Sequence, residues 1–267
     1  MSVIIANKYK LLEQIGKGAF GSIYKAQNIR TNQTVAIKME SLQAETKLLK
    51  NETKIYQYLN GIEGVPSVLW FGVDKTNYYM AIPLLGSSLQ NVIEDSLIVS
   101  FSLEIVILIS IKIIKLLESV HSRGLIHRDV KPDNFLFGLG DRKNQLNIID
   151  FGFCKRYLMD DGLTHIPMRE NRKLLGTPNF VSINMHNGIE PSRRDDLESV
   201  AYIMLYLLNS RLNWDKIVDN KKIQSDKIKT MNDFRIPLKI RDYFIYCRLL
   251  GFDETPNYEK IYNILNR

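Results

Sequence analysis

The chain has 267 residues, of which 45% are hydrophobic and 24% charged, and this composition is typical of a folded globular protein and argues against disorder. The net charge of +7 favours an acidic partner, but no arginine-rich block or known nucleic-acid-binding pattern accompanies it, so no nucleic-acid partner is expected. Two cysteines, Cys154 and Cys247, form no CxxC pair, which favours reduced thiols and a location inside the cell, in the cytoplasm or the nucleus.

Neither a signal peptide nor a membrane span is predicted. Residues 1–7 are too short for an apolar signal region and lack its basic start. The most hydrophobic stretch, residues 97–120, is interrupted by charged side chains, and its longest apolar run falls far short of the ~20 residues that a membrane span needs. We therefore expect a buried helix there.

The first eighty or so residues are predicted to be mostly strand, because β-branched and aromatic residues alternate between turn signals. Strands are expected over 9–15, 22–27, 34–39, 68–73 and 78–82, with a turn at 31–33. One helical pattern, residues 45–59, separates the third strand from the fourth.

The rest of the chain is predicted to be mainly helical, after a connector at residues 83–86. Helices are expected over 103–123, 195–208, 240–250 and 258–266. The predicted fold class is therefore α+β, with a small β-rich lobe over residues 1–83 hinged to a larger, mainly helical lobe over residues 84–267. The chemical motifs fall near the join.

A glycine-rich segment, residues 16–23, joins the first two predicted strands. Its GxGxxG pattern would indicate a dinucleotide site if a helix followed, but a strand follows here. Between two strands, glycines let backbone amides approach a phosphate without interference from Cβ atoms. Taken alone, the segment is explained equally well by an ordinary hairpin turn.

Lys38 ends the third predicted strand and is a candidate partner for the α- and β-phosphates of a nucleotide. A glutamate on the following helix would hold it in place. Glu52, fourteen residues further on, is preferred for this role, and Glu45 is the competitor. An exposed lysine at a strand end is the simpler alternative.

The run from His127 to Asn134 carries the groups that phosphoryl transfer needs. Asp129 would accept or orient the proton of a substrate hydroxyl, and Lys131 would neutralise charge on the transferred group. A lysine two residues after this aspartate favours serine/threonine over tyrosine substrates. Asn134 would hold a second Mg²⁺ through its amide oxygen.

Asp150 would bind the metal ions that bridge the β- and γ-phosphates, with Phe151 and Gly152 setting its orientation. Gly176 and Thr177 are typical of the end of an activation segment, and Thr177 is expected to hydrogen-bond Asp129 and Lys131. Asp-Phe-Gly alone could be a surface turn, but five motifs in fixed order make chance a poor explanation.

Some motifs have simpler interpretations. Asp195 is expected to cap the start of a helix, and Asp196 to brace the catalytic loop from below. Cys154 could be a reactive thiol near Asp150, but a buried packing role is more common. The four histidines show no spacing of metal ligands.

These motifs together resemble the casein kinase 1 family of protein kinases. The resemblance covers residues 9 to 262 and is most specific at Ser182-Ile183-Asn184, where most kinases have Ala-Pro-Glu. The segments that carry it are 84–89, 127–140, 165–167, 169–171, 182–184, 188–190 and 193–199. The resemblance implies one protein kinase domain over 9–267 that uses ATP and Mg²⁺ to phosphorylate serine and threonine in proteins, without activation-loop phosphorylation.

The resemblance also implies which residues contact the ligands. Arg169 and Arg172 would meet the acidic or phosphorylated residues that precede the target site, as charge-assisted contacts would suit. The residues implied for ATP are Ile15, Gly16, Lys17, Gly18, Ala19, Phe20, Gly21, Ser22, Ile23, Ala36, Lys38, Ile82, Pro83, Leu85 and Asp150.

The chain departs from the family at a few positions. Asn179 replaces an arginine, which puts the preference for phosphorylated substrates in doubt. Pro83 replaces a glutamate, although its carbonyl and the amide of Leu85 could still meet adenine. The chain ends soon after Tyr262, so a compact monomer that depends on a stabilising or targeting protein is expected.

Two other functions are alternatives to a serine/threonine kinase. A pseudokinase scaffold would share the fold, but such proteins usually lack one or more of the catalytic residues. All of these are present here, namely Lys38, Glu52, Asp129, Lys131, Asn134 and Asp150. A small-molecule kinase is disfavoured by the peptide-type segment around Thr177.

Overall fold

The computed structural model describes residues 3–18, 21–95 and 100–267, which pack into two compact units. The first comprises Met1–Ser87 and Leu136–Gly152, and the second comprises Ser88–Phe135 and Phe153–Arg267. From the sequence we expected all of residues 84–267 in the second lobe. In the structure, residues 84–87 and 136–152 pack with the first unit. Burial that joins segments far apart in sequence has no local signal, which is why that assignment was not predicted.

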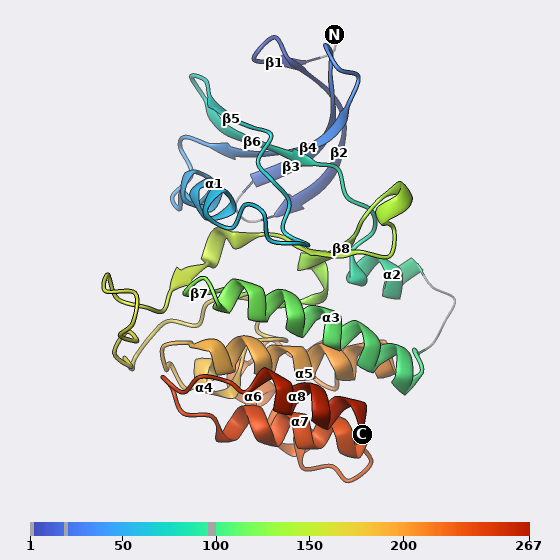
Figure 1. The fold of residues 1–267 in the computed structure, drawn as a ribbon, viewed down its shortest axis with the longest axis vertical. Helices are drawn as coiled ribbons and strands as arrows, with labels where there is room; N and C mark the ends of the chain where they lie inside the picture. Colours follow the sequence, from blue (N-terminus) through green and yellow to red (C-terminus); the bar gives the residue numbers. More distant parts are fainter. Residues whose placement is uncertain (1–2, 19–20, 96–99) are drawn as a thin grey trace. The chain divides into compact units, whose positions relative to one another are not determined.

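The first unit is built on an antiparallel six-stranded sheet in the order β1-β2-β3-β4-β6-β5 (Figure 1). The elements are β1 (Ile4–Ile5), β2 (Tyr9–Gly18), β3 (Gly21–Asn28), β4 (Thr34–Ser41), α1 (Leu49–Tyr58), β5 (Trp70–Val73), β6 (Asn77–Pro83), η2 (Gly140–Arg142) and β9 (Leu146–Ile148). β8 (Phe135–Phe137) pairs with β9 in a small second sheet.

Strand alternation divides the main sheet into two faces, because successive side chains point to opposite sides. One face carries a buried cluster that includes Tyr9, Val35, Ile37 and Ala81. Lys38 lies on the opposite face, the face that α1 contacts through Thr53 and Met80. The sheet therefore has a core on one side and the candidate lysine on the other.

The second unit is mainly helical. Its elements are α2 (Leu89–Asp95), α3 (Leu103–His121), β7 (Leu125–Ile126), η1 (Pro132–Asn134), β10 (Lys155–Arg156), α4 (Ile183–His186), α5 (Arg193–Asn209), α6 (Asn220–Met231), α7 (Leu238–Leu249) and α8 (Tyr258–Asn266). The short helix η3 (Phe151–Phe153) lies where the two units meet in the sequence.

Helix α5 forms the centre of the second unit, where α3 and α7 both pack against it (Figure 1). Nearly every residue of α5 is buried, including charged ones. In α3 the buried residues Val106, Ile113, Leu117 and Val120 recur on one face, so this hydrophobic stretch is an amphipathic core helix, as expected. No helix in residues 3–18, 21–95 or 100–267 is both long and apolar enough to cross a membrane.

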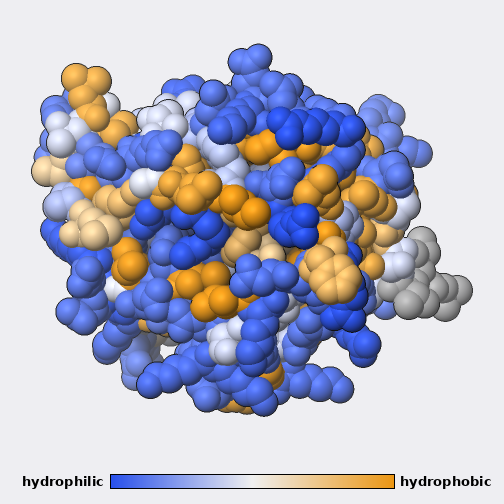
Figure 2. Space-filling model, turned by 90° about the horizontal axis from the view of Figure 1, so that it is seen from below, coloured by the Kyte–Doolittle hydropathy of each residue, from blue (hydrophilic) through white to orange (hydrophobic). Residues whose placement is uncertain are grey.

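The predicted strands correspond to β2, β3, β4, β5 and β6, and the predicted bounds of α8 are those observed. The helix expected to begin at residue 45 begins at Leu49 instead, and the strand expected from residue 68 begins at Trp70. Helices α2, α4 and α6 were not predicted. Figure 2 shows hydrophobic side chains gathered among hydrophilic ones in the middle of the face that it views.

Candidate active site

Lys38 lies in β4, and its ammonium bridges two carboxylates of the first unit. Lys38 Nζ is 2.8 Å from Glu52 Oε2 and 2.9 Å from Asp150 Oδ1. Burial by itself lowers the pKa of a lysine, but attraction by the two carboxylates outweighs it and raises the pKa of Lys38 above 10.5. Lys38 is therefore a fixed positive charge, and it pairs with Glu52, as expected.

The competitor of Glu52 is exposed: Glu45 precedes α1 by four residues. The helix starts late because Glu40 Oε2 accepts hydrogen bonds from the backbone N–H groups of Leu48 and Leu49, at 2.8 and 2.9 Å. A carboxylate at a helix N-terminus satisfies free amides and complements the helix dipole. Glu40 thus sets where α1 begins and, through α1, where Glu52 lies; the sequence did not reveal this role.

The backbone at Asp150 has an unusual conformation that directs its side chain. Its φ is +64°, a left-handed value that is uncommon for a residue other than glycine. The Asp150 N–H donates to the Tyr56 hydroxyl at 3.1 Å, and the Tyr56 ring packs edge-on against Phe151 with centroids 4.9 Å apart. A Cβ on Gly152 would lie only 3.3 Å from Asp150 Oδ1. These contacts hold Asp150 beside Lys38.

Strand register places several of the residues implied for ATP on the face of the sheet that carries Lys38. Ile23 pairs with Lys38 directly, Ala36 lies two residues before it, and Ile82 pairs with Ala36. Gly16 pairs with Ile23 from the neighbouring strand. Because cross-strand partners share a face, the first unit offers a lysine beside a row of small and aliphatic side chains.

The glycine-rich segment lies between two strands, as expected, since β2 ends at Gly18 and β3 begins at Gly21. Gly21 has φ +146°, and a Cβ there would lie 2.1 Å from the Met39 carbonyl oxygen. Only glycine allows this approach of two backbones. Around it, Ile15, Lys17 and Gly18 are exposed and Ser22 is half-buried, while Ala19 and Phe20 lie outside the described residues.

Pro83 and Leu85 belong to a segment whose backbone is joined to β8. Gly86 N–H donates to Phe137 O at 2.8 Å, and a Cβ on Gly86 would lie 2.9 Å from Gly138 O. Pro83 and Leu85 also line a cavity of about 640 Å³, together with parts of residues 60–67 and 138–147. Among the described residues implied for ATP, they are the two that line this cavity.

In the second unit, Asp129 forms a compact cluster with Lys131 and Thr177. Asp129 Oδ1 accepts hydrogen bonds from the backbone N–H and the hydroxyl of Thr177 at 3.0 and 2.9 Å. Lys131 Nζ lies 3.0 Å from Asp129 Oδ2 and donates to Thr177 Oγ1 at 3.1 Å. Both hydrogen bonds that the sequence predicted for Thr177 are present, and they orient a buried carboxylate next to an ammonium.

Asn134 lies five residues after Asp129, and its amide nitrogen donates to the Asp129 carbonyl at 2.8 Å. That bond involves the amide nitrogen of Asn134, whereas a metal ion would bind the amide oxygen. Amide and carboxylate oxygens are the ligands that Mg²⁺ prefers. The chemistry of Asn134 and of the half-exposed Asp150 therefore fits Mg²⁺.

Asp196, on α5, holds the catalytic loop through its backbone. Its carboxylate accepts from the N–H groups of His127 at 2.7 Å and Arg128 at 2.8 Å, as expected. His121 Nε2 lies 2.9 Å from the same carboxylate, and His121 Nδ1 lies 2.5 Å from the Tyr258 hydroxyl. Burial opposes the charge of Asp196, but these contacts outweigh it and lower its pKa. Helix α8 is thereby linked to the catalytic loop.

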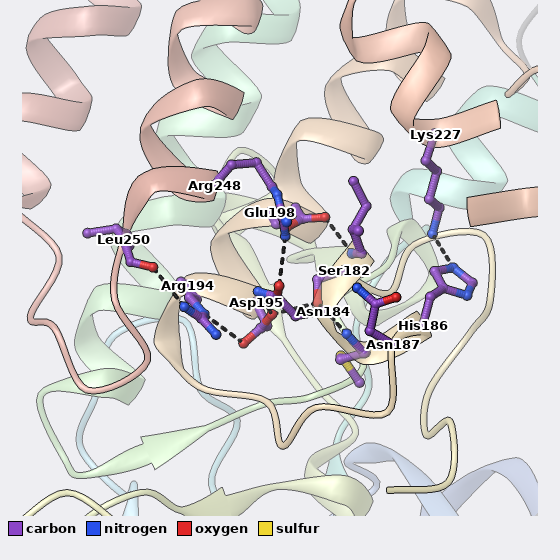
Figure 3. A network of polar contacts seen from close by, with 12 residues as sticks. Ser182, Asn184, His186, Asn187, Arg194, Asp195, Glu198, Lys227, Arg248 and Leu250 are labelled. Atoms are coloured by element: carbon purple, nitrogen blue, oxygen red, sulfur yellow. Dashed lines mark hydrogen bonds and ion pairs between the residues drawn. The ribbon is translucent and has the colours of Figure 1, made fainter. Parts of the chain in front are cut away.

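A second polar network fixes the Ser182-Ile183-Asn184 segment to α5 (Figure 3). Asp195 lies in the first turn of α5 and accepts from Ser192 N–H at 2.8 Å and from the Ser182 hydroxyl at 2.6 Å. Glu198 accepts from Ile183 N–H at 2.7 Å and pairs with Arg248 at 2.9 Å (Figure 3). Asp195 therefore does more than cap its helix.

A cluster of basic side chains surrounds the buried carboxylate of Glu190. Its distances to cationic nitrogens are 2.7 Å for Lys155, 3.2 Å for Arg172 and 4.0 Å for Arg128. Arg128, Arg172 and Glu190 line a pocket of about 440 Å³. The Arg169 side chain is exposed, and its carbonyl accepts from Glu190 N–H at 2.8 Å. The sequence did not identify Lys155 or Glu190, which only the folded chain brings to Arg172.

Cys154 is buried, and burial raises the pKa of its thiol to about 12. A thiol with such a pKa stays protonated and is a poor nucleophile. Cys247 is buried as well, and neither cysteine forms a disulfide. Both are packing residues.

A family model for the protein kinase domain matches residues 9–247 of the chain. The match spans the glycine-rich segment, Lys38, Asp129 and Asp150.

Proposed function

This chain belongs to the protein kinase family, and from that premise we propose that it is a serine/threonine kinase of the casein kinase 1 type. Membership implies protein substrates and the use of ATP with a divalent metal, typically Mg²⁺. The residue specificity and the preference for acidic sites are the finer parts of the proposal.

In this proposal the first unit holds the nucleotide. Backbone amides of the glycine-rich segment approach the phosphates, and Lys38, kept charged and immobile by Glu52, pairs with the α- and β-phosphates. Ile23, Ala36 and Ile82 supply the apolar surface for adenine on the same face of the sheet. The Pro83 carbonyl and the Leu85 amide would meet the polar edge of the base.

Asn134 and Asp150 would hold Mg²⁺, which neutralises charge on the phosphates when bound. The substrate hydroxyl oxygen forms a bond to the γ-phosphorus, and the bond from that phosphorus to the bridging oxygen of ADP breaks. Asp129 takes the hydroxyl proton. Lys131, 3.0 Å from Asp129, offsets negative charge on the transferred group.

The observation that carries the proposal is the cluster of Asp129, Lys131 and Thr177. Thr177 and Lys131 together make three hydrogen bonds and one ion pair, which leave the Asp129 carboxylate in a single orientation. A lysine at this position beside a threonine is the feature from which serine/threonine specificity is inferred.

The basic cluster supports a preference for acidic or phosphorylated substrates. Three cations, Arg128, Lys155 and Arg172, share the one carboxylate of Glu190, which leaves net positive charge at the pocket. Arginine forms short, charge-assisted bonds to phosphate and carboxylate groups. Arg172 lies in this pocket, whereas Arg169 would act from the surface beside it.

The test is phosphate transfer from Mg²⁺-ATP to casein by the purified protein and by an Asp129→Asn variant. We expect incorporation on serine or threonine, and a loss of about 100-fold or more in kcat in the variant because the proton acceptor is gone. Asp141→Asn, an exposed aspartate, is the matched control and should retain activity. Incorporation on tyrosine, or equal rates in Asp129→Asn and wild type, would contradict the proposal.

A pseudokinase scaffold is the second candidate. It would predict a folded protein that binds partners but transfers no phosphate under any of these conditions. We further propose that the kinase acts in the cytoplasm or the nucleus and that a targeting protein stabilises it. We also propose that it is a monomer, and the mass of the purified protein in solution would test this point.

A further inference from the structure

Lys227, on α6, is completely buried, yet it forms no ion pair with any residue in the described parts of the chain. Taking an ammonium out of water is costly unless other groups replace its hydration. A buried lysine in the middle of a polar helix therefore needs hydrogen-bond acceptors that replace the water around its ammonium group.

Three acceptors surround the ammonium. Lys227 Nζ donates to the carbonyl oxygens of Pro178 at 2.7 Å and Val181 at 2.6 Å, and it lies 3.1 Å from His186 Nε2, a contact visible in Figure 3. An ammonium has three N–H donors, so each finds one acceptor. The ammonium also lies 4.5 Å from the ring centroid of Tyr202 and 5.8 Å from that of Trp214, within cation–π range.

The carbonyl groups that Lys227 contacts belong to the segment that follows Thr177. Trp214 extends the same arrangement, because its Nε1–H donates to the Asn179 carbonyl at 3.0 Å. The carbonyls of residues 178, 179 and 181 therefore accept from side chains of a different part of the chain. Lys227 and Trp214 together fix the backbone of residues 178–181 through these carbonyl groups.

The position of the segment gives the contact a functional meaning. Thr177 donates to the Asp129 carboxylate through both its N–H and its hydroxyl, so the segment begins at the proposed proton acceptor. A peptide whose hydroxyl reaches Asp129 must carry its neighbouring residues past residues 178–181. The conformation of that segment is therefore part of the peptide site.

We propose that Lys227 is a positioning residue for the peptide substrate, which holds residues 177–181 in the conformation that accepts the residues flanking the target hydroxyl. Trp214 assists through its bond to Asn179. Neither residue touches the reacting atoms. The proposal rests on the proposed kinase function and adds the residues that shape its protein-substrate site.

The test compares Lys227→Met with wild type in steady-state kinetics on a serine peptide with acidic flanks, varying peptide and ATP separately. Methionine keeps the length and apolar stem of lysine and removes all three donors. We expect the KM for peptide to rise about tenfold or more, because two buried carbonyls lose their donor, while the KM for ATP stays within about twofold. Lys222→Met, an exposed lysine of the same helix, is the matched control and should leave both constants unchanged.

Trp214→Phe keeps an aromatic side chain but removes the N–H that donates to Asn179, together with part of the buried indole surface, so a smaller rise in the peptide KM is expected. This variant decides the question if Lys227→Met does not fold, as thermal unfolding would show. An unchanged peptide KM in a folded Lys227→Met, or equal rises in the KM values for peptide and ATP, would overturn the inference. Absence of phosphate transfer by the wild type would instead refute the proposed function itself.

Discussion

His186 shows how the surroundings of one side chain change its chemistry. Burial, followed by the positive charge of Lys227, lowers the pKa of His186 to about 4 from its ordinary value of 6.5. The ring therefore stays neutral in the folded protein at neutral pH. Its Nε2 is then free to accept from the Lys227 ammonium at 3.1 Å.

The lowered pKa of His186 predicts a pH-dependent loss of stability. Between pH 6.5 and about 4 the unfolded chain binds a proton at this histidine and the folded chain does not, so the free energy of unfolding falls as the pH falls. Relative to His186→Gln, which keeps an acceptor but cannot titrate, wild type should lose about 1–2 kcal/mol across this window. Urea unfolding of both proteins at several pH values measures the difference.

If the difference between wild type and His186→Gln does not change with pH, the pKa of His186 is the same in the folded and the unfolded chain, which would contradict the lowered pKa. Burial lowers the pKa of Lys227, which contacts residue 186, to about 7, a value above this window, so the lysine stays mainly protonated in both folded proteins as the pH falls from 6.5 to about 4. The pH profile therefore isolates the histidine.

Helix α1 shows at the scale of an element how a remote carboxylate determines a boundary. The hydrophobic pattern predicts a helix from residue 45, but the helix begins at Leu49. It begins there because the Glu40 carboxylate accepts hydrogen bonds from the backbone N–H groups of Leu48 and Leu49. The helix then presents Glu52 to Lys38. The ion pair thus depends on a residue that does not take part in it.

Glu40→Ala should destabilise the protein by about 1–2 kcal/mol, the usual cost of losing a helix cap. It should also reduce the rate of phosphate transfer, because Glu52 is no longer held against Lys38. The matched control is Glu45→Ala, an exposed glutamate just before the same helix. Chemical denaturation and a kinase assay on both variants check the prediction; equal effects would show that Glu40 does not position α1.

For the molecule as a whole, 36 basic and 29 acidic residues leave a net charge of +7. Part of this charge gathers around Glu190, where three cations share one carboxylate. Attraction between exposed charges weakens with salt, since the Debye length falls to ~8 Å at 0.15 M. A positively charged enzyme should therefore bind an acidic substrate less well as salt rises.

We expect the KM for an acidic peptide to rise severalfold between low salt and about 0.3 M KCl, with little change for a neutral peptide of the same length. Arg172→Gln should flatten this dependence because it removes one charge from the pocket. The same substitution should leave the KM for ATP unchanged. A neutral peptide with an equally steep dependence would exclude a substrate-specific charge effect.

Local pattern in the sequence was enough to predict most of the sheet, α3, α8 and the order of the chemical motifs. Strand alternation and helical periodicity depend on neighbouring residues, and the motifs depend on fixed spacing. All of these can therefore be recognised in the sequence before the fold is known. The bonds of Thr177 to Asp129 and the brace from Asp196 were also predicted, because the motifs imply them.

Only the tertiary structure decided which distant residues support those motifs. Helix α6 was missed because its buried face includes Lys227, a charged residue that interrupts the hydrophobic period. Glu40, His121 and Glu190 act through partners that folding brings to them. A buried charge is stable only where carbonyls, rings or counter-ions from other segments replace water, and no local pattern in the sequence encodes that environment.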